Sequence, residues 1–242
     1  MTQHRQEPIG SRYPGEMRRT PLLLPLLVAV AVLAGCGGGG SSSTSTTPPA
    51  ALLHPAKLTK KAPQLFDITF HTTKGDFVVT VHRTWAAQGA DRLYNLATNR
   101  FFDGMKIFRV VPNFVVQFGI SPYPPVSKAW ANATIPDDVV TNHNTRGTVS
   151  FASAGPNTRT TQIFVNLGNN SGSLDNNGFA PVGSVTSGMK VLDTLYGGYG
   201  DETTPHQPEI QNQGNAYLEK AYPKLDAITT AVVSNEENPA LP

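Results

Sequence analysis

Residues 108–119 read Phe-Arg-Val-Val-Pro-Asn-Phe-Val-Val-Gln-Phe-Gly, and residues 162–165 read Gln-Ile-Phe-Val. Both stretches are rich in the β-branched and aromatic residues that favour strands. Neighbours in a strand point to opposite faces, so Val116 points to one side and Gln117 to the other. One face of these strands suits a core, whereas the other mixes glutamine with large apolar residues. Such a mixed face is typical of a recognition groove, although a patch covered by a loop would give the same pattern.

The sequence on either side of these stretches predicts more strands. Apolar and polar residues alternate over 66–71 and again over 77–81, and Lys74-Gly75 between them predicts a β-hairpin. Residues 86–99 place apolar side chains three and four apart, which predicts a helix. Further strands are predicted at 107–111, 114–118, 147–152, 162–167, 181–185 and 227–233, a short helix at 187–196, a loop at 197–214 and one or two helical turns at 215–221.

Eight antiparallel strands remove their exposed edges most economically by closing on themselves. We therefore expect a mainly β protein, with a closed eight-stranded antiparallel β-barrel capped by two α-helices.

The composition excludes several classes of protein. Of 242 residues, 39% are hydrophobic, enough for one substantial core, so the chain is not disordered. Only 15% are charged, and 22 Gly and 20 Pro argue against a coiled coil or a helical bundle. The net charge is +2, but four cations and two acids precede residue 36, which leaves 15 of each sign. Without a basic field, we expect no nucleic-acid partner.

The first 36 residues predict export. Arg18-Arg19 is followed by an apolar run over 22–33 that is too short to span a bilayer comfortably, so residues 1–35 are interpreted as a signal peptide. Leu33-Ala34-Gly35-Cys36 resembles a bacterial lipobox, in which the cysteine is diacylated and becomes the new N-terminus. A stray core cysteine is the alternative. Cys36 is the only cysteine, so no internal disulfide can form.

The remaining boundaries follow from composition. Residues 36–63 carry the lipidated cysteine and a Gly-, Ser- and Pro-rich stretch that predicts a flexible tether. The folded domain is expected over 64–233 and a disordered tail over 234–242. The protein is then exported and lipid-anchored through Cys36 to a bacterial membrane, with its domain in the periplasm or extracytoplasmic space.

Three ordered motifs carry a family resemblance. Residues 108–119, residues 151–164 and the pair Leu174-Asp175 followed by residues 179–183 resemble the signatures of cyclophilin-type peptidyl-prolyl cis-trans isomerases. The resemblance implies an eight-stranded antiparallel barrel with two helices, an enzyme that accelerates rotation about Xaa-Pro bonds, and no cofactor or metal. The partners it implies are proline-containing polypeptides, and we expect a monomer.

The resemblance also assigns site residues. Arg109 corresponds to the catalytic arginine. The proline pocket maps to Phe114, Val115, Phe164, Leu174 and Phe179, and contacts to the peptide backbone map to Gln117, Ala152, Ser153 and Gln162. Val115, Ser153 and Phe179 stand where the best-known members have Met, Asn and His, and Ser173 stands where eukaryotic members have the Trp associated with cyclosporin binding.

Other functions are weaker alternatives. A binding module or chaperone on the same scaffold, with little catalysis, would capture proline-containing segments of exported proteins, but it would not need Arg109. A structural or adhesive surface protein is supported only by the lipid anchor. Ser153, His143 and Asp175 form a conceivable hydrolytic triad, but the Gly-x-Ser-x-Gly elbow is missing. The six histidines are scattered, without the spacing of metal ligands.

Overall fold

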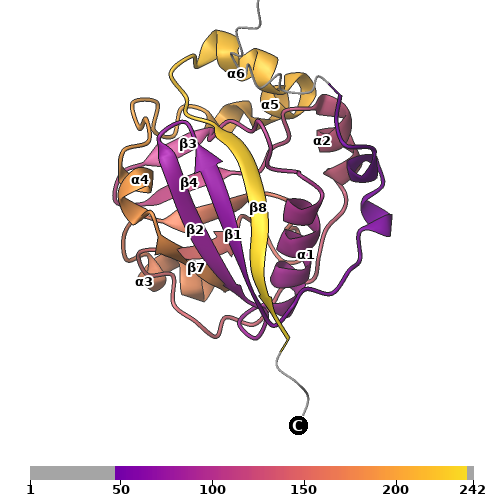
Figure 1. Cartoon of the computed structure of the whole chain (residues 1–242). Helices are drawn as coiled ribbons and strands as arrows, with labels where there is room; N and C mark the ends of the chain where they lie inside the picture. The colour runs from indigo at the N-terminus through magenta and orange to yellow at the C-terminus, as the bar shows by residue number, and fades with distance from the viewer. Residues whose placement is uncertain (1–46, 239–242) are drawn as a thin grey trace, which may run out of the picture. The chain divides into compact units, whose positions relative to one another are not determined.

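The alternating segments form one antiparallel sheet. The computed structural model describes residues 47–238, and every strand pair in it is antiparallel. The strands are β1 (Leu65–Thr72), β2 (Gly75–His82), β3 (Arg109–Val111), β4 (Val115–Phe118), β5 (Thr148–Phe151), β6 (Ile163–Asn166), β7 (Pro181–Ser187) and β8 (Ile228–Glu237). Their order across the sheet is β3-β4-β6-β5-β7-β2-β1-β8, and Figure 1 shows β2, β1 and β8 side by side. The predicted hairpin is confirmed, with Phe70 opposite Phe77 and their rings stacked at 4.8 Å.

The sheet curls into a half-barrel, so the mainly β class is confirmed but the expected full closure is not. Next to the two end strands, Lys106 and Ala227 form an isolated bridge, and three backbone hydrogen bonds accompany it, from Gly104 to Thr229, from Ile228 to Met105 and from Ile107 to Asp226. Beyond the bridge the free side of β3 has other partners, because Val110 pairs with Gly200 and the Thr203 hydroxyl donates to the Phe108 carbonyl. A segment that follows β7 in the chain therefore occupies the position where β8 would complete the ring.

The helices are more numerous than expected. They are α1 (Ala87–Thr98), α2 (Pro124–Trp130), α3 (Ser171–Leu174), α4 (Met189–Asp193), α5 (Gln207–Gln213) and α6 (Asn215–Ala221), with 3₁₀ turns η1 (Ala50–Leu53), η2 (Pro55–Lys57), η3 (Asp175–Asn177) and η4 (Thr204–His206). The predicted helices at 86–99, 187–196 and 215–221 are confirmed as α1, α4 and α6. The loop predicted at 197–214 is wrong where α5 forms, and α2 was not predicted. Both begin with proline in the first turn, a position that lacks an intrahelical N–H bond in any case.

The main core joins buried residues of α1 to buried residues of the sheet. One face of α1 buries Ala90, Leu93 and Leu96 completely, and Figure 1 shows α1 beside β8. A second, smaller cluster lies apart from this core under α5 and α6, and it consists of Phe108, Ile120, Ile210, Leu218, Tyr222 and Leu225.

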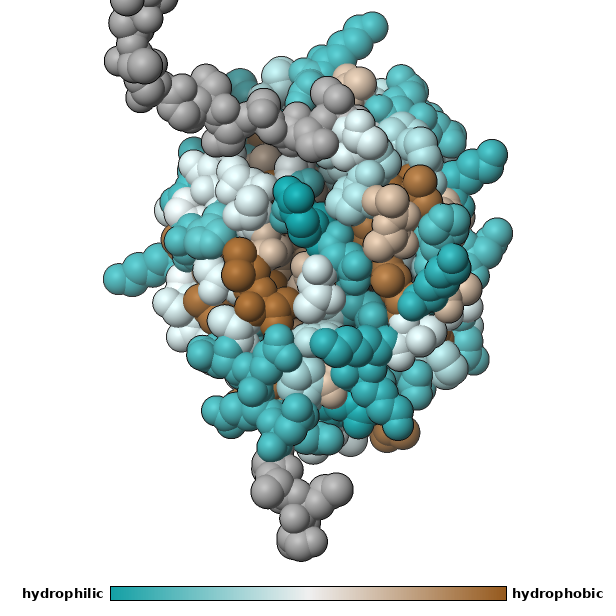
Figure 2. Space-filling model, turned by 45° about the vertical axis from the view of Figure 1, so that its right-hand side comes forward, coloured by the Kyte–Doolittle hydropathy of each residue, from teal (hydrophilic) through white to brown (hydrophobic). Residues whose placement is uncertain are grey.

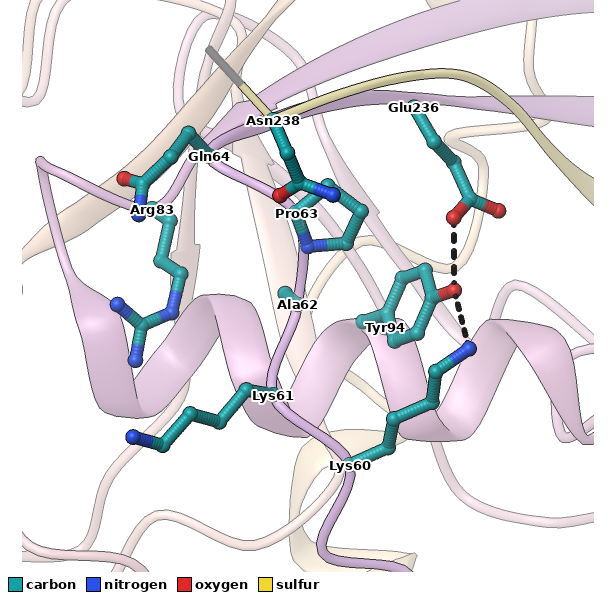
Figure 3. A pocket seen from close by; sticks show the side chains of 9 residues that line it. All are labelled: Lys60, Lys61, Ala62, Pro63, Gln64, Arg83, Tyr94, Glu236 and Asn238. Carbon is teal, nitrogen blue, oxygen red and sulfur yellow. Dashed lines mark hydrogen bonds between the residues drawn. The ribbon is translucent and has the colours of Figure 1, made fainter. Parts of the chain in front are cut away.

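The domain begins earlier than composition predicts. Residues 50–63, assigned above to the tether, pack on the domain: Leu52 is 1% exposed within the main core. The Trp130 indole N–H donates to the Leu52 carbonyl at 2.8 Å. Figure 3 shows the chain from Lys60 running along α1, with Lys60 Nζ donating to the Tyr94 hydroxyl, which donates to Glu236. Buried contacts of a few residues thus outweigh a composition typical of a linker.

The C-terminal boundary also moves. The disordered tail was predicted from residue 234, but β8 continues to Glu237 because Leu65 of β1 pairs with it. The Asn235 side chain donates to Asp67 at 2.7 Å. The predicted signal peptide, residues 1–35, and the predicted lipidation site, Cys36, lie outside the described residues.

The surface carries no single dominant apolar face in the view of Figure 2, where brown patches are separated by hydrophilic side chains. Among residues 47–238, no helix has the length and apolar character needed to cross a membrane.

Candidate active site

Three neighbouring strands align the central residues of the candidate site. Arg109 on β3 lies opposite Gln117 on β4, and Gln117 lies opposite Phe164 on β6. We call this side of the three strands the site face. The intervening residues on the same strands belong to the main core, and they are Val110, Val116 and Val165. The two-faced pattern expected from strand parity is therefore confirmed.

Arg109 is held over an aromatic ring. Its Nη1 donates to Gln117 Oε1 at 2.8 Å, and its guanidinium carbon lies 5.3 Å from the centre of the Phe114 ring. Gln117 in turn donates from Nε2 to Gln162 Oε1 at 2.9 Å. A cation above an aromatic face is attracted by the ring quadrupole. The structure thus brings four of the predicted residues into one contact set, with the cation at its centre.

The apolar side of the site is formed by two rings and a loop. Phe164 and Phe179 meet edge to face with their centres 5.8 Å apart. Phe179 N–H donates to the Leu174 carbonyl, which brings Leu174 to the same loop. Val115 is 2% exposed and pairs with Asn166, so it lies largely beneath the surface. Half-buried Phe179 and Leu174 remain the accessible apolar groups of this loop.

Two predicted backbone-binding residues differ in their placement. Ala152 N–H donates to the Gln162 carbonyl at 2.9 Å, which places it beside the polar side of the site. The Ser153 hydroxyl donates to the Gly155 carbonyl at 2.5 Å and lies 3.0 Å from the Thr158 hydroxyl. The Ser153 side chain is thus bonded within its own loop, and among residues 47–238 it makes no hydrogen bond to another predicted site residue.

Of the three residues considered for a hydrolytic triad, only the histidine and the aspartate are in contact. His143 Nδ1 lies 2.8 Å from Asp175 Oδ2, as in the acid–histidine half of a triad. Ser153, however, has the partners just described, and none of them is His143. The pair therefore lacks a nucleophile among the residues proposed for it.

Asp175 fixes the loop that carries Leu174 and Phe179. Its Oδ1 accepts hydrogen bonds from both the backbone and the side-chain amide of Asn144, and that side chain also donates to the Phe179 carbonyl at 2.7 Å. Burial acts to raise the pKa of Asp175, but the hydrogen bonds from Asn144 and His143 outweigh it and hold this pKa below its ordinary value. Asn144 was not predicted, since a lone asparagine in a polar stretch gives no signal.

Gly119 allows the close approach of two segments of the site. Its φ is +116°, and a Cβ at this position would lie 2.5 Å from the Thr161 carbonyl oxygen and 2.6 Å from Gln162 Cα. Only glycine tolerates both conditions. The glycine that ends the first quoted stretch therefore sets the distance between β4 and the residue that bonds to Gln117.

Beside Gln162 lies a cavity of about 90 Å³. The rings of Phe101 and Trp130, with centres 5.9 Å apart, form part of its wall, and Ser121 and Thr161 add polar groups. It offers space next to the site face for a small side chain.

Two residues that were not predicted reach the site from the region expected to be a loop. Arg109 Nε donates to Asp201 Oδ1 at 2.6 Å, and Gln162 Nε2 donates to Gln207 Oε1 at 2.9 Å. The Asp201 side chain is 62% exposed, so water has access to this ion pair. No metal-binding group of three or more His, Cys, Asp or Glu side chains occurs within residues 47–238.

The fold and the site together define an antiparallel half-barrel with a cation beside aromatic rings, and the comparisons with known proteins give its family. Residues 66–214 match the family model described as cyclophilin type peptidyl-prolyl cis-trans isomerase/CLD. The chain belongs to this family.

Named relatives agree with this assignment. Over 106 residues the chain is 31% identical to peptidyl-prolyl cis-trans isomerase-like 3 of Neurospora crassa. This match covers 40% of the present chain and 64% of the Neurospora protein. Over 133 residues it is 30% identical to a peptidyl-prolyl cis-trans isomerase of Acinetobacter baylyi, covering 53% of this chain and 70% of that one. The fold resembles a Cryptosporidium parvum cyclophilin-type isomerase crystallised in the presence of the dipeptide Ala-Pro, with a TM-score of 0.51, 15% identity, and coverage of 70% and 99%.

Proposed function

We propose that this domain accelerates cis–trans rotation about Xaa-Pro bonds of exported proteins and thereby assists their folding, with Arg109 as the catalytic residue. The observation that carries the proposal is the placement of the Arg109 guanidinium over Phe114 and beside Gln117 on the site face. The Cryptosporidium isomerase was crystallised in the presence of Ala-Pro, which supports a proline-containing ligand for this chain.

The chemistry requires a group that acts on the prolyl nitrogen. Rotation about an amide bond crosses a barrier of about 18–20 kcal/mol, because the nitrogen shares its lone pair with the carbonyl. When the bond twists, the lone pair localises on nitrogen and can accept a hydrogen bond. Arg109 provides a permanent charge and rigid donors, so its interaction is stronger with the twisted state than with the planar one.

Arg109 does not account for the whole rate. A well-placed donor in a dry site contributes about 3–4 kcal/mol, whereas a 10⁵-fold acceleration requires about 7 kcal/mol. We propose that the proline ring rests against Phe164 and Phe179 while Gln117 and Gln162 hold the peptide backbone. With one side of the bond held, the other side turns toward the reactive geometry.

The export context is the part of the proposal that rests on sequence alone. The apolar run before Leu33-Ala34-Gly35-Cys36 supports a signal peptide and a lipid anchor. We propose that the anchor keeps the domain at the outer side of a bacterial membrane, in the periplasm or extracytoplasmic space, where newly exported chains are still unfolded.

The test replaces Arg109 and follows isomerisation of a short Xaa-Pro peptide. Arg109→Ala is expected to lower kcat/KM at least tenfold with little change in thermal unfolding, and Arg109→Lys to recover only part of the loss, since lysine lacks the planar fork. Arg83→Ala is the matched control, because its side chain is 22% exposed against 19% for Arg109 and it also pairs with a carboxylate, that of Asp91.

The outcomes separate catalysis from binding. Arg83→Ala is expected to keep the parent activity. If the unmodified protein binds proline peptides without accelerating rotation, or if Arg109→Ala retains full activity, the domain is a proline-binding module or chaperone instead.

A further inference from the structure

The 197–224 segment, which links α4 to the last strand, carries its own small core. It contains η4, α5 and α6, and it packs its apolar residues Ile210, Leu218 and Tyr222 against Phe108 and Ile120. Phe108 directly precedes Arg109 in the chain. The segment is therefore built onto the start of β3 and does not extend freely into solvent.

Two polar side chains of the 197–224 segment reach the site face. Asp201 accepts from Arg109, and Gln207 accepts from Gln162. With the bonds from Arg109 to Gln117 and from Gln117 to Gln162, five side chains form one continuous hydrogen-bonded chain. Both of its ends lie on the same segment. A linked chain of this kind polarises and orders its members together.

Asp201 limits the freedom of the arginine in a specific way. The guanidinium is bonded at Nε by Asp201 and at Nη1 by Gln117, at 2.6 and 2.8 Å. Two such bonds fix both the plane and the rotation of the group. Nη2 makes no hydrogen bond to residues 47–238, so it is the nitrogen left to donate to a ligand.

We propose that Asp201 is a positioning residue for the isomerase reaction, which holds the Arg109 guanidinium so that Nη2 faces the bound peptide. This inference rests on the proposed catalytic role of Arg109. Asp201 itself bonds to Nε on one side of the guanidinium, so its role is to orient Arg109 and not to contact the reacting bond.

The carboxylate has two opposing effects, and exposure decides between them. It orients the guanidinium, and it also offsets part of the positive charge that acts on the prolyl nitrogen. Because the Asp201 side chain is 62% exposed, water screens its field, whereas its hydrogen bond at 2.6 Å still sets the geometry. Removing the side chain is therefore expected to slow the reaction.

The experiment compares three variants of the full chain in the peptide isomerisation assay, with kcat and KM measured separately. Asp201→Ala is expected to lower kcat about fivefold and to change KM less than twofold, because orientation matters most in the twisted state. Asp201→Asn keeps an oxygen that accepts from Nε and is expected to retain more than half of the parent kcat. Glu202→Ala removes the adjacent exposed acid, whose side chain makes no hydrogen bond or ion pair within residues 47–238, and is expected to match the parent.

The activity of Arg109→Ala tests the catalytic role of Arg109, on which this inference rests. If that variant is fully active, the catalytic assignment of Arg109 fails, and this inference fails with it. If Arg109→Ala is inactive while Asp201→Ala equals or exceeds the parent, the positioning role alone is overturned. Equal losses in Asp201→Ala and Asp201→Asn would also overturn it, because charge and not orientation would then be responsible.

Discussion

At the scale of single residues, the site depends on side chains whose partners lie far away in the sequence. Strand parity was sufficient to predict that Gln117 and Phe164 each lie on the side of their own strand opposite the core, because alternation is a local property of a strand, and the register of the structure places the two opposite each other. Asp201 was not predictable in this way. Its bond joins residues 92 positions apart, and the acid lies in a polar stretch without periodicity.

Asp175 links pH to the loop that carries Phe179. Its pKa is lower in the folded protein than in the unfolded chain, so its hydrogen bonds stabilise the fold above about pH 4, the ordinary range of an aspartate. This contribution is lost as the pH falls through the lower folded-state pKa. We expect Asp175→Asn to lower the melting temperature at pH 7, and the difference from the parent to disappear near pH 2.

Melting curves recorded from pH 7 to pH 2 would check this expectation. Parallel curves for the two proteins over the whole range would contradict it, since an aspartate makes stability depend on pH only when its pKa differs between the folded and the unfolded state.

At the scale of elements, the segments that periodicity failed to predict are those whose structure depends on a few buried contacts or on a proline in the first turn of a helix. The strands and α1 were predictable because their periodicity extends over many residues. η1 was not, because a Pro- and Ala-rich stretch carries no periodicity, and yet it places Leu52 in the core. Lack of periodicity also explains why α2 was not predicted and why the α5 region was predicted to be a loop; both helices have proline in their first turn.

Leu52 and Leu53 give a direct test of this boundary. Leu52→Ala removes a side chain that is 1% exposed and is expected to destabilise the protein by about 2–5 kcal/mol. Leu53 is 38% exposed, so Leu53→Ala is expected to cost less than about 0.5 kcal/mol. Urea unfolding of both variants measures the two free energies. Equal values would show that residues 50–63 do not contribute to the core.

At the scale of the whole molecule, the proposed anchor joins an enzyme to a membrane through one residue. Cys36→Ser is expected to abolish labelling with radioactive palmitate in bacterial cells and to release the protein from the membrane fraction. Peptide isomerisation should be unchanged, because the site residues all lie between 109 and 207. Palmitate incorporation in the serine variant would contradict the assignment of Cys36.

The incomplete closure of the sheet places the end of a sheet next to the site face. An unpaired strand at the rim of a sheet is a template on which another chain can add a strand of its own and aggregate. β3 stands at such a rim and carries Arg109, but Gly200 pairs with Val110 and Thr203 bonds to Phe108 on its outer side. The outer side of β3 is therefore already hydrogen-bonded next to Arg109, and a peptide bound at the site face meets no free strand edge there.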